Sequence, residues 1–227
     1  MILENKIFGG LRSKGIFKNG SNTKPLISVV TVVLNGEQYL EKAILSVLKQ
    51  TYDNVEYIIV DGGSSDGTID IIRKYSDLID FWISEKDSGL YNAMNKGILI
   101  SRGDFIGFVG SDDYLYPNTL EKIAEASNKK SIDYTVGPVD IIEEDGKLLE
   151  KILVLPSFSS KNRFIFDMAT HHLSFYISRK IINEVKFFDE NFKIRSDYDM
   201  TIKVISTYKN YYNFIDSVGA FRKGGIS

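Results

Sequence analysis

The run LISVVTVVL, Leu26–Leu34, decides the fold class. It is rich in β-branched residues and nearly free of polar ones, which predicts a strand buried on both faces. The segments that follow alternate between helix and strand: Gln38–Gln50, Val55–Val60, a helix after Asp66, Phe81–Ser84, Leu90–Ile100, Phe105–Val109 and Pro117–Ala126. This alternation predicts an α/β fold, a Rossmann-like and mostly parallel sheet with helices on both faces.

The second half of the chain is less regular and predicts a mixed arrangement. Short strands are expected at Tyr134–Val136, Val139–Ile142, Lys147–Leu155, Tyr211–Ile215 and Val218–Phe221. Helices are expected at Ser178–Val185 and Asp197–Thr207, where apolar residues recur at helical spacing.

Composition places the chain among ordinary globular proteins. Of its 227 residues, 43% are hydrophobic and 26% are charged. This length is enough for one large α/β domain or two small ones. The net charge of −2 gives no overall basic field, so we expect no nucleic-acid partner. The chain has no cysteine, which excludes disulfides, thiolate catalysis and cysteine-bound metals. Its longest apolar run is too short to span a bilayer, and no signal peptide is visible.

The first 24 residues differ from the rest. Five basic residues and one acid give Met1–Lys24 a net charge of +4. One interpretation is a loosely ordered extension. The other is peripheral contact of its basic and apolar side chains with an anionic membrane surface. We therefore expect a basic extension over residues 1–24 and one domain over 25–227.

Three predicted strands of the sheet end in polar or flexible loops. These are Asn35–Glu37, Asp61–Gly63 and Ser111–Asp113. Ligands of open parallel sheets bind beyond the carboxyl ends of the strands, so the three loops are the candidate site. No G-x-G-x-x-G follows the first strand and no G-x-x-x-x-G-K-[ST] occurs, which argues against a dinucleotide site and removes the common phosphate loop.

Acidic residues in these loops allow both structural and chemical interpretations. Asp112 and Asp113 form a hard oxygen site suited to Mg²⁺ or Mn²⁺ on a substrate phosphate, or else a polar turn. Asp61 can accept a hydrogen bond from a nucleobase N–H such as that of uracil, or can order its own turn.

Two further groups lie in the second half. Asp197 and Asp199 stand at the start of a predicted helix whose apolar residues recur at helical spacing. Their charges either stabilise the positive end of the helix dipole, or one of them acts as a general base. His171 and His172 are adjacent, with no metal-ligand spacing nearby, and a core or surface pair is the simpler interpretation.

Several motifs, in order, resemble the inverting glycosyltransferases of family 2 with the GT-A fold. The resemblance runs from Pro25 to Ser227 and is carried by these segments: ISVVTVVLNGE (27–37), AILSVLKQTY (43–52), DGGSSDGT (61–68), EKDSGLYNAMNKG (85–97), SDD (111–113), FFDE (187–190) and SDYD (196–199). Within the family, the chain is similar to bacterial polysaccharide-assembly enzymes, including the colanic-acid type. The resemblance implies a donor half of about 25–115 and an acceptor half of about 116–227.

The resemblance also implies roles for individual residues. At the uracil, the implied contacts are Asp61, Glu37 and the main chain near Thr31 and Val33. Asp112 would lie near the ribose. Asp87 and Asn95 would line the donor pocket. Asp113 would hold the metal, Asp197 would be the base, and His171 would lie near the phosphate or the acceptor. The chain departs from the pattern at Gly62, where many members have a second Asp.

The implied activity is transfer of a hexosyl or N-acetylhexosaminyl group from a nucleotide sugar, expected to be a UDP-sugar. The acceptor would be a hydroxyl of a saccharide or lipid-linked saccharide. The reaction would depend on a metal ion and would invert the anomeric centre. Mn²⁺ or Mg²⁺ would be the cofactor. The implied setting is polysaccharide assembly for the cell envelope, in the cytoplasm or peripherally on the inner face of its membrane. The alternatives are a nucleotidyltransferase and a non-catalytic nucleotide-binding domain.

Overall fold

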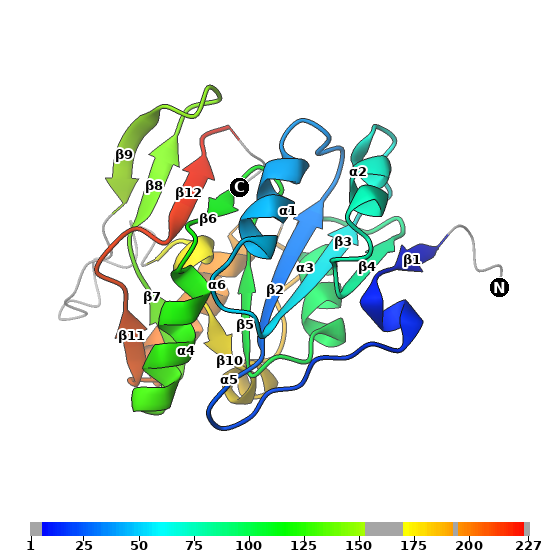
Figure 1. Cartoon of the computed structure of the whole chain (residues 1–227). Coiled ribbons are helices and arrows are strands. Elements are labelled where there is room, and N and C mark those ends of the chain that lie inside the picture. Colours follow the sequence, from blue (N-terminus) through cyan, green and yellow to red (C-terminus); the bar gives the residue numbers. More distant parts are fainter. Residues whose placement is uncertain (1–5, 153–169, 193–194, 225–227) are drawn as a thin grey trace.

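The computed structural model describes residues 6–152, 170–192 and 195–224. Its centre is an eight-stranded sheet in the order β1-β4-β3-β2-β5-β10-β7-β11 (Figure 1). The strands of this sheet are β1 (Ile7–Gly9), β2 (Ile27–Val33), β3 (Val55–Asp61), β4 (Phe81–Ser84), β5 (Phe105–Phe108), β7 (Tyr134–Val136), β10 (Ile177–Ser178) and β11 (Tyr211–Asn213). The four central strands, β4, β3, β2 and β5, run parallel. Strand β10 then pairs antiparallel with β5 and β7, so the sheet becomes mixed in its second half.

Helices cover both faces of this sheet. They are α1 (Leu40–Leu48), α2 (Thr68–Lys74), α3 (Leu90–Ile100), α4 (Thr119–Lys129), α5 (Arg179–Val185) and α6 (Ser196–Thr207). Side chains of β2 alternate between the two faces: Val29 packs with α1, α2 and α4, and Val30 packs with α3, α5 and α6. Among the residues that the structure describes, no helix has the length and apolar character needed to cross a bilayer.

A close approach fixes helix α3 against strand β2. A side chain at Gly97 would place its Cβ 2.4 Å from Val30 Cγ1, so only glycine allows this spacing. Because α3 follows the loop after β4 directly, its position also fixes where that loop lies at the edge of the sheet.

A second, smaller sheet has the order β6-β12-β8-β9. Its strands are β6 (Tyr114–Leu115), β8 (Val139–Ile142), β9 (Leu148–Ile152) and β12 (Gly219–Arg222). Strand β6 begins directly after Asp113, and β12 pairs with it antiparallel. The small sheet therefore joins the end of the chain to the acidic loop.

The predicted α/β class is confirmed, and Phe81–Ser84, Leu90–Ile100, Tyr134–Val136 and Val139–Ile142 have the predicted bounds. The sequence missed β1, β6 and β10, which have two or three residues each, as well as two short 3₁₀ turns, Leu11–Lys14 and His172–Ser174. Segments this short carry no periodicity in the sequence. The short strands form because a neighbouring strand already offers unpaired backbone groups, so they depend on tertiary context.

Residues 6–24 of the N-terminal segment pack against the domain. Strand β1 adds to the sheet antiparallel to β4, and the chain then passes below the sheet in Figure 1. Each of its five basic side chains pairs with an acid of the domain: Lys6 with Glu85, Arg12 with Glu56, Lys14 with Asp77, Lys18 with Asp80, and Lys24 with Asp53. The interpretation of a loosely ordered extension is therefore wrong for residues 6–24. The division into extension and domain stays a prediction.

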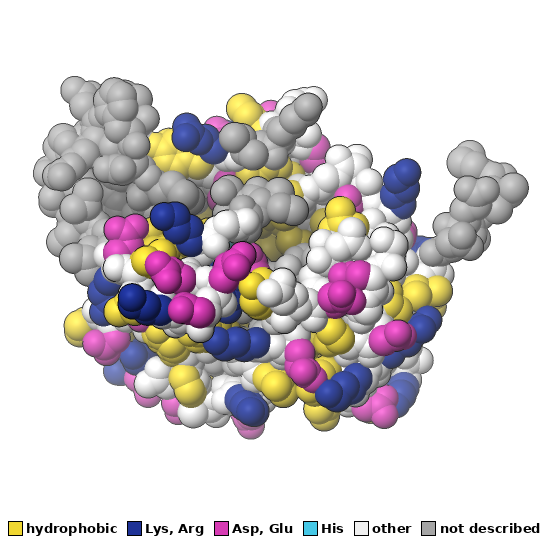
Figure 2. All heavy atoms as spheres, turned by 90° about the horizontal axis from the view of Figure 1, so that it is seen from above, with side chains coloured by type: hydrophobic (Ala, Val, Ile, Leu, Met, Phe, Trp, Pro, Cys, Tyr) yellow, Lys and Arg dark blue, Asp and Glu magenta, His cyan; other side chains and the backbone are white. Residues whose placement is uncertain are grey.

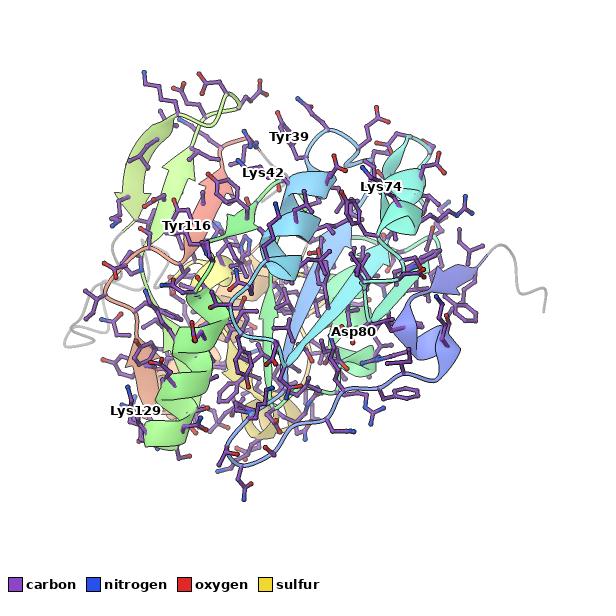
Figure 3. The ribbon with its side chains drawn as sticks, viewed as in Figure 1. Tyr39, Lys42, Lys74, Asp80, Tyr116 and Lys129 are labelled. Atoms are coloured by element: carbon purple, nitrogen blue, oxygen red, sulfur yellow. The ribbon has the colours of Figure 1, made fainter. Side chains whose placement is uncertain are left out.

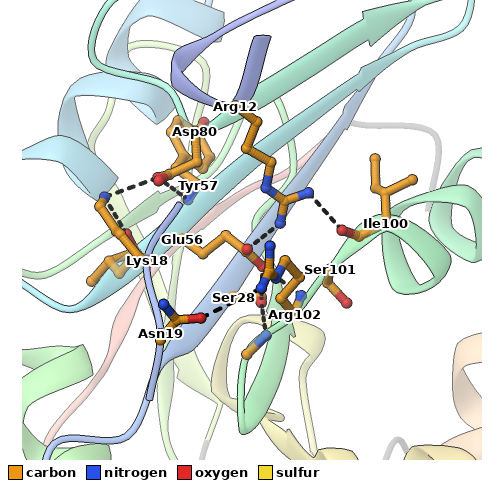
Figure 4. Close-up of polar contacts among 12 residues, drawn as sticks. Arg12, Lys18, Asn19, Ser28, Glu56, Tyr57, Asp80, Ile100, Ser101 and Arg102 are labelled. Carbon is orange, nitrogen blue, oxygen red and sulfur yellow. Dashed lines mark hydrogen bonds and ion pairs between the residues drawn. The ribbon is translucent and has the colours of Figure 1, made fainter. Parts of the chain in front are cut away.

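Arg12 and Glu56 form the most buried of these pairs, with side chains 11% and 2% exposed (Figure 4). The guanidinium donates to the Glu56 carboxylate and to the carbonyl of Ile100, at 2.7 Å. Glu56 also accepts from Ser28 Oγ at 2.5 Å and from the backbone N–H of Arg102 at 2.7 Å. This network joins residues 6–24, the N-terminal arm, to two strands and to the end of α3.

Candidate active site

The three polar loops predicted from the sequence meet at one edge of the large sheet. Strands β2, β3 and β5 are parallel, so their carboxyl ends share this edge, which is uppermost in Figure 1. Figure 2 looks down on it and shows acidic and basic side chains interspersed over the surface. From β2 the chain adds β3 and then β4 on one side, and it returns through α3 to place β5 on the other side of β2. Ligands of open α/β sheets bind at such a switch point.

The loops after β2 and β3 are tied together. The backbone N–H of Asn35 donates to Ser64 Oγ at 2.7 Å, and Asn35 Oδ1 accepts from Ser65 N at 2.9 Å. Glu37 Oε2 accepts from the backbone N–H of Gly67 at 2.6 Å. Glu37 therefore acts here as a tie between loops. Its predicted contact with uracil stays a prediction.

Asp61, at the end of β3, is fully buried and orders its own turn. Its carboxylate accepts from the backbone N–H groups of Gly63 and Ser64, at 3.1 and 3.0 Å. It also accepts from the hydroxyl groups of Ser64 and Ser84. A carboxylate has about four acceptor positions, so one of these bonds would have to open for Asp61 to reach a nucleobase. The uracil contact stays a prediction.

Strand β2 offers little of its main chain to a ligand. Thr31 is fully buried, with Oγ1 3.0 Å from the Tyr57 hydroxyl. The carbonyl of Val33 already accepts from the backbone N–H of Gly62 at 2.9 Å. The predicted contacts of the main chain near Thr31 and Val33 with uracil stay predictions.

The departure of the chain at Gly62 is explained by Asp87. A Cβ at residue 62 would lie 2.4 Å from Asp87 Oδ2. Asp87, which is partly buried in the loop after β4, is held there by the backbone N–H of Gly89, which donates to Oδ1 at 2.9 Å. The carboxylate of Asp87 therefore occupies the space where a side chain at position 62 would stand.

Asp113 lies at the centre of the acidic loop and is 1% exposed. Its Oδ1 accepts from the backbone N–H of Arg222 at 3.0 Å. Its Oδ2 lies 3.1 Å from His172 Nε2, in hydrogen-bonding contact. The predicted metal-binding residue is thus held by β12 on one side and by the 3₁₀ turn of His172–Ser174 on the other.

The charges around this loop favour a cation. Burial and the neighbouring charge of Asp113 raise the pKa of Asp112. Burial lowers the pKa of His172, but the hydrogen bond to Asp113 and the charges of Asp113, Asp197 and Asp112 outweigh it, so the net direction is upward. No group of three or more acidic or histidine side chains suited to a metal occurs in the described part of the chain. The paired carboxylates fit Mg²⁺ or Mn²⁺, which need few protein ligands when substrate phosphates complete the shell.

Of the two histidines, the structure brings His172 rather than His171 to the acidic loop. His171 is 6% exposed, and its ring packs against Phe221 in a tilted arrangement with centroids 4.5 Å apart. Burial, with the nearby His172, lowers the pKa of His171 well below its usual range, so this ring is neutral. The predicted place of His171 near the phosphate or the acceptor stays a prediction, and His172 is the histidine that contacts Asp113.

Arg222, in strand β12 of the second sheet, lies beside the acidic loop, and no sequence motif predicted this position. Its guanidinium donates to the carbonyls of Glu143, at 2.9 Å, and Glu144. It lies 4.2 Å from the centre of the Tyr39 ring, at the start of α1. Tyr39 and Lys42 stand at this end of α1 in Figure 3. Burial, and then the charge of Arg222, lower the pKa of Lys42.

Asp197, the predicted base, lies in the first turn of α6 and points into the same region. Its Oδ1 accepts from the Tyr91 hydroxyl at 3.0 Å. Asp197 and His172 line one small recess, whose other walls are mostly apolar side chains. The structure therefore brings the predicted base next to the histidine that contacts the predicted metal ligand.

Asn95 joins α3 to the acceptor-side segment. It is 6% exposed, and its side-chain amide exchanges hydrogen bonds with the backbone of Phe188 at 3.0 and 2.9 Å. It also donates to Glu190 Oε1 at 2.8 Å. Its predicted place in the lining of the donor pocket stays a prediction.

Comparison with known proteins gives the same family as the motifs. The sequence model of glycosyl transferase family 2 matches residues 28–192. An uncharacterized glycosyltransferase of Rickettsia bellii is 31% identical over 83% of this chain and 29% of its own length. A putative teichuronic acid biosynthesis glycosyltransferase of Bacillus subtilis, TuaG, is 27% identical over 89% of this chain and 81% of its own length. The five most similar curated relatives reported are longer, and the chain spans 29% to 61% of them.

Solved structures show the same fold. Residues 1–349 of TarS from S. aureus, in a complex with UDP-GlcNAc, superimpose with a TM-score of 0.71 at 20% identity, over 88% of this chain and 59% of that chain. The mannosyltransferase PcManGT of Pyrobaculum calidifontis, in a complex with GDP-Man and Mn²⁺, gives a TM-score of 0.64 at 18% identity, over 95% of this chain and 64% of its own. These likenesses support the GT-A architecture. The chain belongs to glycosyl transferase family 2.

Proposed function

We propose that the chain transfers a hexosyl or N-acetylhexosaminyl group from a UDP-sugar to a hydroxyl of a saccharide or lipid-linked saccharide, with inversion. Membership of glycosyl transferase family 2 supports glycosyl transfer. TarS with UDP-GlcNAc and PcManGT with GDP-Man and Mn²⁺ share the fold, which supports a nucleotide-sugar donor and a divalent ion. The likeness to TuaG supports a role in polysaccharide assembly.

One observation carries the proposal. His172 contacts Asp113 at 3.1 Å, and His172 and Asp197 line the same recess. A diphosphate at Asp113 would therefore lie close to a carboxylate that can act as a base. Asp113 and Asp197 come from opposite halves of the chain, as transfer between a donor and an acceptor requires.

In the proposed reaction the acceptor oxygen attacks the anomeric carbon from the face opposite the nucleoside diphosphate. The carbon–oxygen bond to the acceptor forms as the bond to the diphosphate breaks, which inverts the anomeric centre. Asp197 accepts the proton of the acceptor hydroxyl. Positioned base catalysis of this kind contributes roughly 10²–10⁴ in rate.

Asp113 would hold the divalent ion, with Asp112 beside it near the ribose. When bound, a Mn²⁺ or Mg²⁺ ion supplies Lewis-acid stabilisation of the charge that develops on the leaving diphosphate. The chain itself keeps Asp113 in place through Arg222 and His172.

A donor screen tests the proposed function. The protein is incubated with Mn²⁺ and each of UDP-glucose, UDP-galactose, UDP-GlcNAc and UDP-GalNAc, and the released nucleotide is identified. Release of UDP is expected, and loss of that release in Asp197→Asn supports the assigned base. Release of sugar 1-phosphate in place of UDP, which follows attack at the α-phosphate, would instead indicate a nucleotidyltransferase. Binding without turnover, with saccharide acceptors present, would indicate a non-catalytic domain.

Contact of residues 1–24 with an anionic membrane surface stays a hypothesis. Such contact would bring the enzyme to a lipid-linked acceptor on the cytoplasmic side. The ion pairs favour a structural role instead, because each of the five basic side chains already has an acidic partner in the domain. Sedimentation with anionic vesicles separates these roles. Vesicle binding that falls when Lys6, Lys14 and Lys24 are changed to Gln would support membrane contact.

A further inference from the structure

Helix α3 links the two halves of the site. It begins at Leu90, directly after the loop that carries Asp87. Tyr91 and Asn95 are four residues apart, so their side chains lie on one face of this helix. Asn95 binds the backbone of Phe188, and Tyr91 binds Asp197. One helix therefore holds both acceptor-side segments relative to the donor loop.

We propose that Tyr91 is the positioning residue for the base Asp197, and this assignment rests on the proposed function. The Tyr91 hydroxyl donates to Asp197 Oδ1 at 3.0 Å, across 106 residues of chain. In the described part of the chain, Asp197 Oδ2 has no hydrogen bond to a side chain, so it is left to accept the proton of the acceptor hydroxyl. The bond to Tyr91 thus fixes which oxygen faces the substrate.

The Tyr91 side chain is well held and remains a donor. It is 5% exposed, and its ring packs on Phe188 with centroids 5.8 Å apart. Burial, followed by the charge and hydrogen bond of Asp197, raises the pKa of Tyr91 to about 12. The hydroxyl therefore keeps its proton at neutral pH and can only direct Asp197, not exchange protons with it.

Two groups from other elements act on the Asp197 carboxylate. Tyr91 of α3 donates to it, and His172 of the 3₁₀ turn lines the same recess as Asp197. Because His172 already contacts Asp113, Tyr91 is the partner dedicated to Asp197. A dedicated neutral donor orients a carboxylate without neutralising its charge.

Tyr91→Phe tests the assignment, because it removes the hydroxyl and keeps the ring. The probes are the UDP-sugar that gives the fastest UDP release in the donor screen, and UDP with Mn²⁺ for binding. We expect kcat to fall about 10- to 100-fold, the size expected for a charge-assisted hydrogen bond. The KM for the donor and the Kd for UDP with Mn²⁺ should stay within about twofold. Tyr208→Phe is the matched control, because it removes a tyrosine–carboxylate bond to Glu184 at the far end of α6.

A double-mutant cycle separates positioning from a general structural role. If Tyr91 acts through Asp197, Tyr91→Phe should change kcat no further in the Asp197→Asn background. An unchanged kcat in Tyr91→Phe would overturn the assignment. So would equal losses in both backgrounds, or a matching loss of affinity for UDP. A wild-type protein that releases no UDP from any donor would overturn the proposed function and this assignment with it.

Discussion

His172 Nε2 lies 3.1 Å from Asp113 Oδ2, although 59 residues separate them along the chain. The residue before it, His171, is buried, and its ring packs against Phe221 with centroids 4.5 Å apart. Two adjacent histidines thus have different environments, one at the predicted diphosphate position and one in the core.

This difference predicts separate effects of the two histidines. His172→Ala should weaken the binding of UDP with Mn²⁺ roughly 10- to 100-fold, as expected for a partner that orients a metal ligand. His171→Ala should instead lower the free energy of unfolding, because it leaves a gap in the core. Calorimetry of UDP binding and urea unfolding measure the two effects. Weakened binding only in the His171 variant would contradict the assignment.

Removal of metal ions tests Asp113 directly. We expect UDP release by the wild type to stop in excess EDTA and to return when Mn²⁺ is restored. Asp113→Asn should show little response to Mn²⁺, because its amide lacks the charge that holds a cation. Asp140→Asn is a suitable control, since Asp140 bonds to Tyr116 and Ser217 in the second sheet. Undiminished release in EDTA would rule out the metal assignment.

The contact between Gly62 and Asp87 predicts an effect on donor binding rather than on stability. Gly62→Ala forces the Asp87 carboxylate aside, because the new Cβ would lie 2.4 Å from Oδ2. The moving atom is the end of a side chain, so the free energy of unfolding should change little. If Asp87 contacts the donor, the KM for the donor should rise in Gly62→Ala. In an Asp87→Ala background, Gly62→Ala should then have no further effect on KM, and an equal rise there would contradict the explanation.

The N-terminal arm should contribute to stability through Arg12. Arg12→Ala leaves Glu56, whose side chain is 2% exposed, without its ionic partner. Loss of one member of a buried pair costs about 3–5 kcal/mol of unfolding free energy, measured by urea denaturation. Lys14→Ala is the control, because Lys14 and Asp77 are both exposed and contribute little. Equal effects of the two variants would show that the arm does not stabilise the domain through Arg12.

The sequence predicted the parts of the fold that periodicity controls. Leu26–Leu34 became β2, and Leu90–Ile100 became α3 with its bounds unchanged. Sequence reasoning could also place Asp112 and Asp113 at a strand end, because a buried strand precedes them. Site residues were predictable where a local motif places them at such an end.

Contacts between distant segments were beyond sequence reasoning. The bond of Tyr91 to Asp197 and that of Asn95 to Phe188 depend on how α3 packs against the acceptor half. The motif predicts a donor-pocket role for Asn95, but it does not indicate that the amide also binds the backbone of Phe188. The short strand that brings Arg222 to Asp113 likewise depends on pairing with β6.

The most direct test of the central claim is the anomeric configuration and amount of product formed by the wild type and by Asp197→Asn. The reaction uses the UDP-sugar selected by the donor screen and an acceptor saccharide, and NMR spectroscopy follows the anomeric proton. We expect the α-linked donor to give a β-linked product, and we expect Asp197→Asn to lose roughly 10²–10⁴ in rate while its affinity for UDP with Mn²⁺ is retained. A product with retained configuration, or an Asp197→Asn variant with the wild-type rate, would contradict the account.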